Sequence, residues 1–127
     1  IRAGSLSMTD SAKLGAFSSG QSQVAGNITV QTSDFVALDN DSRISAFASG
    51  TGAGGNILIE TGRLRVLNGS WIFAPVSGDK PAGQLTVNAS ESVEVAGVFL
   101  KNGMFFRSSI SIETLGAANA GTLTINT

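Results

Sequence analysis

The 127-residue chain has no cysteine, no histidine, only two prolines and only 13% charged residues. Without cysteine there is no disulfide framework, and without histidine the commonest metal ligand and general base is missing. The net charge of −1 gives neither a phosphate backbone nor an anionic membrane a strong attraction. We therefore expect no nucleic-acid partner, and because the longest apolar runs are short we expect no transmembrane segment.

What the sequence does contain is small and apolar residues, with 16 glycines and a hydrophobic fraction of 42%. This is enough apolar material for a core, and together with tight-turn residues and few charges it favours an all-β protein. The length predicts a single domain over residues 1–127. Because the first residue is isoleucine, we expect a processed or excised piece.

A short phrase recurs four times and alternates polar with apolar residues, as a strand with one buried face does. The copies occupy residues 26–32, 55–61, 83–89 and 121–127, which sets repeat boundaries near 26, 55, 83 and 121. The last spacing is one period plus an insertion of about ten residues. The inward residues of this first strand are predicted to be Ile28 and Val30, Ile57 and Ile59, Leu85 and Val87, and Leu123 and Ile125.

Two more strand patterns follow each copy. The second strand has the inward pairs Leu6 and Met8, Val36 and Leu38, Leu64 and Val66, and Val93 and Val95. A corner then reads Asp10, Asn40, Asn68 and Gly97, residue types that accept left-handed backbone angles. The third strand has the inward pairs Leu14 and Ala16, Ile44 and Ala46, Ile72 and Ala74, and Ile110 and Ile112. Small-residue loops close the periods at 20–25, 50–54, 78–82 and 116–120.

Three strands per period of about 28 residues describe one coil of a parallel β-helix, or β-solenoid, with four to five coils stacked. A sandwich or barrel is the alternative fold. If each coil rises by one strand spacing of about 4.8 Å, equivalent side chains lie above one another. We then expect Asn27, Asn56 and Gln84 to form an amide ladder. The outward column of Gln31, Glu60, Asn88 and Asn126 is not the threonine array that an ice-binding surface requires.

Three phrases resemble a known group: Ala-Gly-Asn-Ile-Thr-Val at 25–30, Leu-Ser-Met-Thr-Asp at 6–10, and Ala-Gly-Thr-Leu-Thr-Ile-Asn at 120–126. They resemble the repeat regions of filamentous-haemagglutinin-like exoproteins of two-partner secretion systems, particularly cyanobacterial surface proteins. The resemblance covers essentially the whole chain. It implies a right-handed parallel β-helix on a secreted bacterial polypeptide, located outside the cell or at its surface and used for adhesion, aggregation or coating.

The one departure from regularity is the insertion at 98–107, between a second and a third strand, which contains Phe99, Phe105 and Phe106. Insertions in solenoids become loops on one face, often the binding face, so these residues are candidates for partner contact. The partner would be a host or cell-surface glycan or protein. Alternatively, the three rings fold back as a small cluster that covers the side of the helix, flanked by Lys101 and Arg107.

Two further positions have a candidate role. Trp71 stands beside inward Ile72 and should face outward, where its ring could stack on a sugar or pack against the insertion. The acidic run at 39–41 could hold Ca²⁺, but Asp41 is replaced by Ser11 and Gly69 in the adjacent periods. A corner turn is therefore the preferred interpretation of this run, and no metal or cofactor is expected.

No catalytic arrangement is predicted, because the acidic residues do not converge and a histidine-based triad is impossible. We expect a non-catalytic structural or adhesive segment of a secreted bacterial surface protein or filament. The alternative is a carbohydrate-binding or carbohydrate-active β-helix module.

The ends of the chain do not resemble natural ends. Thr127 closes a first strand, and Ile1 begins where a second strand is expected. Either the chain is cut from a longer β-helix, or copies associate end to end by strand addition, each completing the coil of its neighbour.

Overall fold

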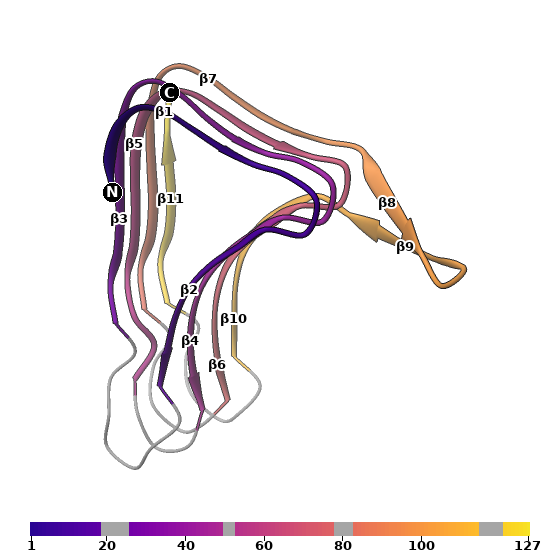
Figure 1. The fold of residues 1–127 in the computed structure, drawn as a ribbon. Coiled ribbons are helices and arrows are strands. Elements are labelled where there is room, and N and C mark those ends of the chain that lie inside the picture. Colours follow the sequence, from indigo (N-terminus) through magenta and orange to yellow (C-terminus); the bar gives the residue numbers. More distant parts are fainter. Residues whose placement is uncertain (19–25, 50–52, 78–82, 115–120) are drawn as a thin grey trace.

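The computed structural model describes residues 1–18, 26–49, 53–77, 83–114 and 121–127, and these residues form strands and turns without a helix (Figure 1). The predicted loops at 20–25, 50–54, 78–82 and 116–120 lie wholly or largely outside this part of the chain. Within it, no helix could span a membrane. The strands are β1 (Arg2–Met8), β2 (Lys13–Ser18), β3 (Ile28–Leu38), β4 (Arg43–Ser49), β5 (Ile57–Leu67), β6 (Trp71–Ser77), β7 (Leu85–Ala96), β8 (Val98–Lys101), β9 (Met104–Arg107), β10 (Ser109–Thr114) and β11 (Leu123–Asn126).

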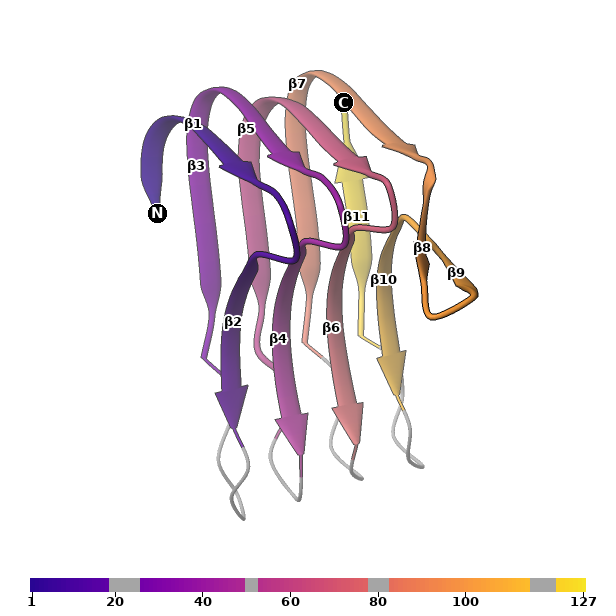
Figure 2. The same cartoon turned by 45° about the vertical axis from the view of Figure 1, so that its right-hand side comes forward.

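The strands form two parallel sheets, and successive strands along the chain belong alternately to one sheet and the other, apart from the inserted β8 and β9 (Figures 1 and 2). Sheet A has the order β1-β3-β5-β7-β11, and sheet B has the order β10-β6-β4-β2. Both sheets are open, and their pairing joins equivalent residues of successive periods, such as Ile28 with Ile57 and Ile57 with Leu85. The prediction of an all-β protein is confirmed, and the repeated phrase lies in register with itself.

In β3, β5 and β7, the predicted first and second strands of a period are one continuous strand with a bend. β3 and β5 each run for 11 residues, and their pairing shifts between Gln31 and Phe35. The pairing of β5 with β7 shifts between Thr61 and Arg63. The prediction of two separate strands was therefore wrong. A shift in pairing bends a strand without ending it, because the pairing with the neighbouring strand resumes after the bend.

The bend depends on a close backbone approach at Gly62. Beyond the hydrogen bond that joins Thr32 to Thr61, this glycine alone precedes Arg63 in β5, whereas two residues precede the paired Phe35 in β3. These two residues are Ser33 and Asp34. A Cβ atom placed on Gly62 would lie 2.5 Å from the carbonyl oxygen of Asp34. Only glycine therefore lets the shorter bend of β5 pass beside the longer bend of β3.

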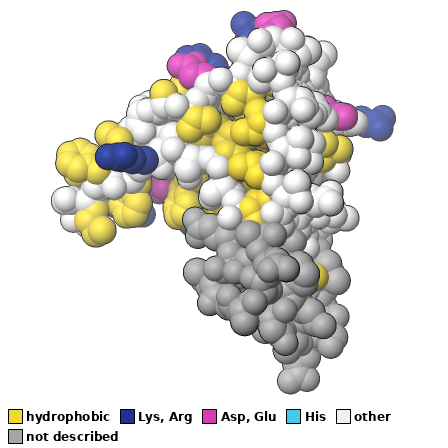
Figure 3. All heavy atoms as spheres, turned by 180° about the vertical axis from the view of Figure 1, so that it is seen from behind, with side chains coloured by type: hydrophobic (Ala, Val, Ile, Leu, Met, Phe, Trp, Pro, Cys, Tyr) yellow, Lys and Arg dark blue, Asp and Glu magenta, His cyan; other side chains and the backbone are white. Residues whose placement is uncertain are grey.

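The hydrophobic core lies between the two sheets and consists of the inward pairs predicted from the repeat. In the central strands these side chains are fully enclosed: Val30, Val36, Leu38, Ile44, Ile59, Leu64, Val66, Ile72, Leu85 and Val87. The equivalent residues at the end of the stack that carries β11 are less covered, with Leu123 42% and Ile125 44% exposed. Figure 3 views this end, where hydrophobic side chains lie open between the sheets. Val95, predicted to face inward, is also 42% exposed.

The corner between the sheets has the left-handed backbone that its composition predicted. The residues with positive φ at this corner are Asp10, Ser11, Asn40, Asp41, Asn68, Gly69 and Gly97. The corners bond to one another as strands do, since Ser11 N donates to Asn40 O over 2.8 Å and Asn68 N donates to Ala96 O over 2.9 Å. Inter-strand bonding is thus carried from sheet A to sheet B through the corner.

Replacing Gly62 tests the bend. The change Gly62→Ala should lower the free energy of unfolding by about 1–3 kcal/mol, because the Asp34 carbonyl must move to make room for the methyl group. The matched control is Gly4→Ala, at the bend of β1, where an added Cβ meets nothing within 4 Å. That variant should change stability by less than about 0.5 kcal/mol in urea denaturation. Equal losses at the two positions would show that the close approach is not what restricts Gly62.

Candidate functional site

The insertion at 98–107 is a β-hairpin that projects from the corner between β7 and β10 (Figure 2). β8 and β9 are antiparallel, with Phe99 opposite Phe106 and Leu100 opposite Phe105. The turn consists of Asn102 and Gly103, whose φ angles are 51° and 77°. Two successive positive φ angles identify the two-residue turn for which Asn-Gly is strongly preferred. The predicted insertion is therefore an ordered element.

The two faces of the hairpin differ in exposure. Phe99 and Phe106 are half-buried and share one face. The opposite face presents Val98, Leu100 and Phe105, which are 48%, 58% and 70% exposed. In Figure 3 the hairpin is a lobe on which hydrophobic side chains surround basic ones. Of the three phenylalanines predicted to contact a partner, Phe105 alone is mostly exposed, and the other two are half-buried.

Gly69 is the point on the corner against which the hairpin packs. A Cβ atom on Gly69 would lie 2.4 Å from Cβ of Phe99 and 2.9 Å from the carbonyl oxygen of Phe106. The hydroxyl of Ser108 accepts from Gly69 N over 2.9 Å and donates to Ala96 O over 2.7 Å. These contacts fix the base of the hairpin.

The acidic run at 39–41 is engaged in the corner itself. The side chain of Asp41 is 6% exposed, accepts a hydrogen bond from Ser11 Oγ over 3.2 Å, and lies 3.5 Å from Arg43 Nη2. Arg43 contacts Oδ1 of Asp41, while Oδ2, the oxygen bonded by Ser11, also lies 3.9 Å from Nζ of the hairpin's Lys101. Asp39 Oδ1 accepts from the backbone N–H of the next residue over 2.8 Å. Because protein donors already bond these carboxylates, the preferred interpretation as a corner turn fits, and no cluster of three metal-ligating side chains occurs among the described residues.

Trp71 lies half-buried on the outward face of sheet B, as its position beside Ile72 predicted. Its ring stacks on Phe73 with centroids 5.0 Å apart, and the guanidinium carbon of Arg43 lies over it at 4.8 Å. Trp71 Nε1 and Arg43 Nε are buried without an acceptor in the part of the chain that the structure describes. The indole therefore has a cation and an aromatic ring as neighbours already, and stacking on a sugar would compete with them.

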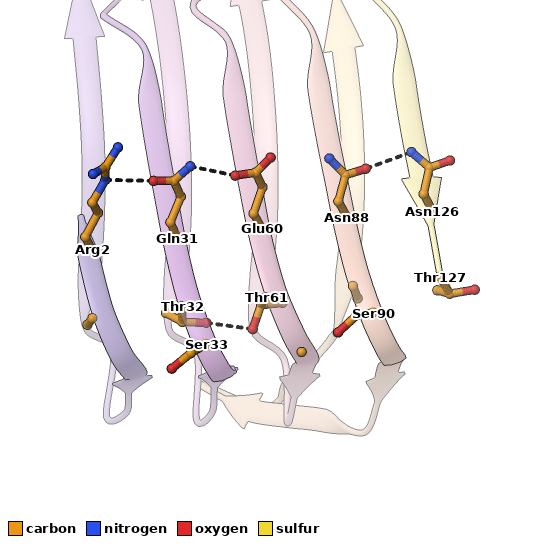
Figure 4. Close-up of a pocket in the computed structure, with 13 residues that line it drawn as sticks. Arg2, Gln31, Thr32, Ser33, Glu60, Thr61, Asn88, Ser90, Asn126 and Thr127 are labelled. Carbon is orange, nitrogen blue, oxygen red and sulfur yellow. Dashed lines mark hydrogen bonds between the residues drawn. The ribbon is translucent and has the colours of Figure 1, made fainter.

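A second surface is a polar groove along the bend of sheet A, with a volume of about 670 Å³ (Figure 4). One residue from each strand forms a row along it: Arg2, Gln31, Glu60, Asn88 and Asn126. The sequence placed four of these in an outward column but assigned them no function. Figure 4 shows their side chains aligned across the strands.

The groove row is only partly bonded to itself. Arg2 Nε donates to Gln31 Oε1 over 2.8 Å, and Gln31 Nε2 donates to Glu60 Oε2 over 2.6 Å. Asn126 Nδ2 donates to Asn88 Oδ1 over 2.8 Å. No hydrogen bond joins Glu60 to Asn88 among the described residues, so the row has a gap at its third step (Figure 4).

The predicted amide ladder has a different form from the one expected. Asn27 Oδ1 accepts from the backbone N–H of Asn56 over 2.9 Å, and Asn56 Oδ1 accepts from the backbone N–H of Gln84 over 2.8 Å. The prediction of bonds between side-chain amides was wrong for this column, because these residues precede the strands and their backbone N–H groups are open to a side-chain acceptor.

Charges on the outer face of sheet A pair across strands. Arg63 bonds Asp34 through Nη2, and its Nε lies 3.5 Å from Glu91 Oε2. The hydrogen bond that Arg63 donates to Asp34, together with the negative charges of Asp34 and Glu91, raises the pKa of Arg63 above its ordinary value. These groups are about half exposed, so each pair contributes little to stability.

Comparison of the chain with protein-family models, curated protein sequences and solved structures finds no match.

Replacing Gly69 tests the attachment of the hairpin. The change Gly69→Ala adds a methyl group against Phe99 and also strains a φ of +79°, so it should cost on the order of 1–3 kcal/mol and alter the fluorescence of nearby Trp71. Gly103→Ala is the control, because its φ of +77° is equally unfavourable while an added Cβ meets nothing within 4 Å. The control should leave the emission of the chain's only tryptophan unchanged. An unchanged emission in both variants would contradict the packing of the hairpin on the corner.

Proposed function

We propose that sheets A and B are sides of a right-handed parallel β-helix with about 28 residues per coil and four to five coils. Paired residues such as Ile28 and Ile57 stand one period apart, which supports this arrangement. The bend divides each long strand into two sides, and a strand of sheet B supplies the third. Right-handedness is supported by the general rule that crossovers between parallel strands are right-handed in about 98% of cases.

We further propose that the chain is a non-catalytic structural and adhesive segment of a secreted bacterial surface protein or filament. The observation that carries this proposal is the hairpin, an apolar element projecting from an otherwise uniform stack. In such stacks each coil contacts only its neighbours, so the repeat builds length and stiffness while an insertion supplies the contact. The resemblance to filamentous-haemagglutinin-like repeat regions supports the same role.

The proposed partner of the hairpin is a protein surface with an apolar patch bordered by acidic groups. Val98, Leu100 and Phe105 offer aliphatic and aromatic contact area, and Met104 beside the turn is 63% exposed. The hairpin carries two of the chain's eight basic residues and no acidic residue. A single exposed ring gives a glycan little to stack on, whereas interfaces between proteins favour exposed aromatic and methionine side chains flanked by arginine.

Removing the exposed apolar residues tests adhesion. Cells that display the chain with Leu100→Ser and Phe105→Ser should adhere to protein-coated surfaces about ten-fold less than cells with the unmodified chain, since a few central anchors dominate such interfaces. Adhesion is measured as the number of cells retained in a flow chamber.

The matched control is Phe17→Ser on β2, where the ring is 68% exposed against 70% for Phe105. This variant should adhere normally. If it reduced adhesion as much as the hairpin variant does, non-specific hydrophobic adsorption would explain the binding.

We also propose that copies of this chain associate end to end. β1 and β11 are the open edges of sheet A, and the exposed Leu123 and Ile125 pair with the fully enclosed Leu85 and Val87. The strand of a second copy would cover both the apolar side chains and the unpaired backbone groups of β11.

Light scattering after size exclusion tests this association. The unmodified chain should increase in mass with concentration, and Ile125→Arg should remain monomeric because it places a charge in the joint. Thr124→Arg, on the outward side of the same strand, should associate normally. If the unmodified chain were monomeric at every concentration, end-to-end association would be contradicted.

A further inference from the structure

The groove has the chemistry of a site for a hydroxyl-rich ligand. Its lining side chains are amides, hydroxyls, two alanine methyl groups, one carboxylate and one guanidinium, with no aromatic side chain. The opposite charges of Arg2 and Glu60 leave the row without a net charge. An anionic ligand would meet the carboxylate of Glu60, and an apolar ligand would bury polar groups without partners.

Two groups at the gap in the row are available to a ligand. Glu60 bonds Gln31 through Oε2 only, and Asn88 bonds Asn126 through Oδ1 only. Within the described part of the chain, this leaves Glu60 Oε1 as a free acceptor and Asn88 Nδ2 as a free donor. An acceptor and a donor side by side match a hydroxyl group, which donates one hydrogen bond and accepts another.

Gly62 widens the same groove. It belongs to the same strand as Glu60 and contributes no side chain, whereas the strands on either side contribute Ser33 and Ser90 (Figure 4). The bend that requires glycine for backbone packing thus also leaves space in the groove, on the strand that carries Glu60.

The spacing of the row selects among extended ligands. Neighbouring strands lie about 4.8 Å apart, so the row repeats at that interval across sheet A. This interval is close to the length of one pyranose ring. An extended peptide advances about 3.3 Å per residue and would lose register with the row after one or two strands.

We propose that the groove binds a linear neutral polysaccharide, laid across the strands with one sugar ring per strand. Glu60 Oε1 accepts from a sugar hydroxyl and Asn88 Nδ2 donates to one, while Arg2 and Asn126 contact the rings at the two ends. This site is separate from the hairpin and independent of the adhesive role proposed for it.

Calorimetric titration with β-1,4-linked glucose oligomers tests the site. Affinity should rise with oligomer length up to five rings, one for each strand that lines the groove, and should then level off. Hexamers of galacturonic acid should bind more weakly than neutral hexamers of glucose, xylose or mannose. Absence of binding by all three neutral hexamers at millimolar concentration, or tighter binding of the acidic hexamer, would overturn the proposal.

Two variants locate the binding. Ser90→Trp places an indole at the exposed rim of the groove and should abolish binding, whereas Ser92→Trp, exposed on the same strand but outside the groove lining, should not. Glu60→Gln should weaken binding about ten-fold, because a hydrogen bond to a charged acceptor is replaced by a neutral one.

Binding that survives Ser90→Trp would place the glycan elsewhere and overturn the proposal. The hairpin variant Leu100→Ser with Phe105→Ser should bind the hexamer normally. Loss of glycan binding in that variant would equally overturn a site in the groove, whatever the variant does to adhesion.

Discussion

The structure depends on parallel hydrogen bonding between equivalent residues of successive periods. This pairing requires each period to return the chain to the same place one strand further along, so every side chain keeps one face throughout the stack. The core columns, the polar row and the stacked corners are all consequences of the same register. A slip of one residue would turn the apolar pairs outward in all of them together. The register of the backbone pairing is therefore more tightly constrained than any single side-chain contact.

Much of this arrangement could be read from the sequence because periodic features repeat their signal. The inward pairs of four strand copies and the corner residues were predicted by residue number. The continuous bent strands were not, since a pairing shift between Thr61 and Arg63 is set by the neighbouring backbone and leaves little trace in composition. The burial of terminal pairs such as Leu123 and Ile125 was overestimated, because a strand pattern does not show whether another strand covers it.

Less of the candidate surfaces than of the fold could be predicted from the sequence. The hairpin could have been identified in full, since Asn102-Gly103 between two apolar runs is a strong hairpin signal. The two-residue turn also sets the pairing of Phe99 with Phe106. Which face of the hairpin is covered depends on its contact with Gly69, and that contact cannot be derived from residue types. The groove was missed for another reason. Its side chains were recognised as an outward column, but the hollow itself arises from a bend in the backbone.

The position of the hairpin has a consequence for how such a chain can diversify. Ten residues enter between Gly97 and Ser108, yet Ser108 N still bonds Gly97 O, and Ser109 pairs with Trp71 as if nothing intervened. The corner therefore accepts added length without disturbing either sheet. Foreign segments grafted at the equivalent corners after Asn40 or Asn68 would each be displayed at a fixed spacing along the two sheets. The sheets and the segments inserted at their corners can thus be varied or engineered separately.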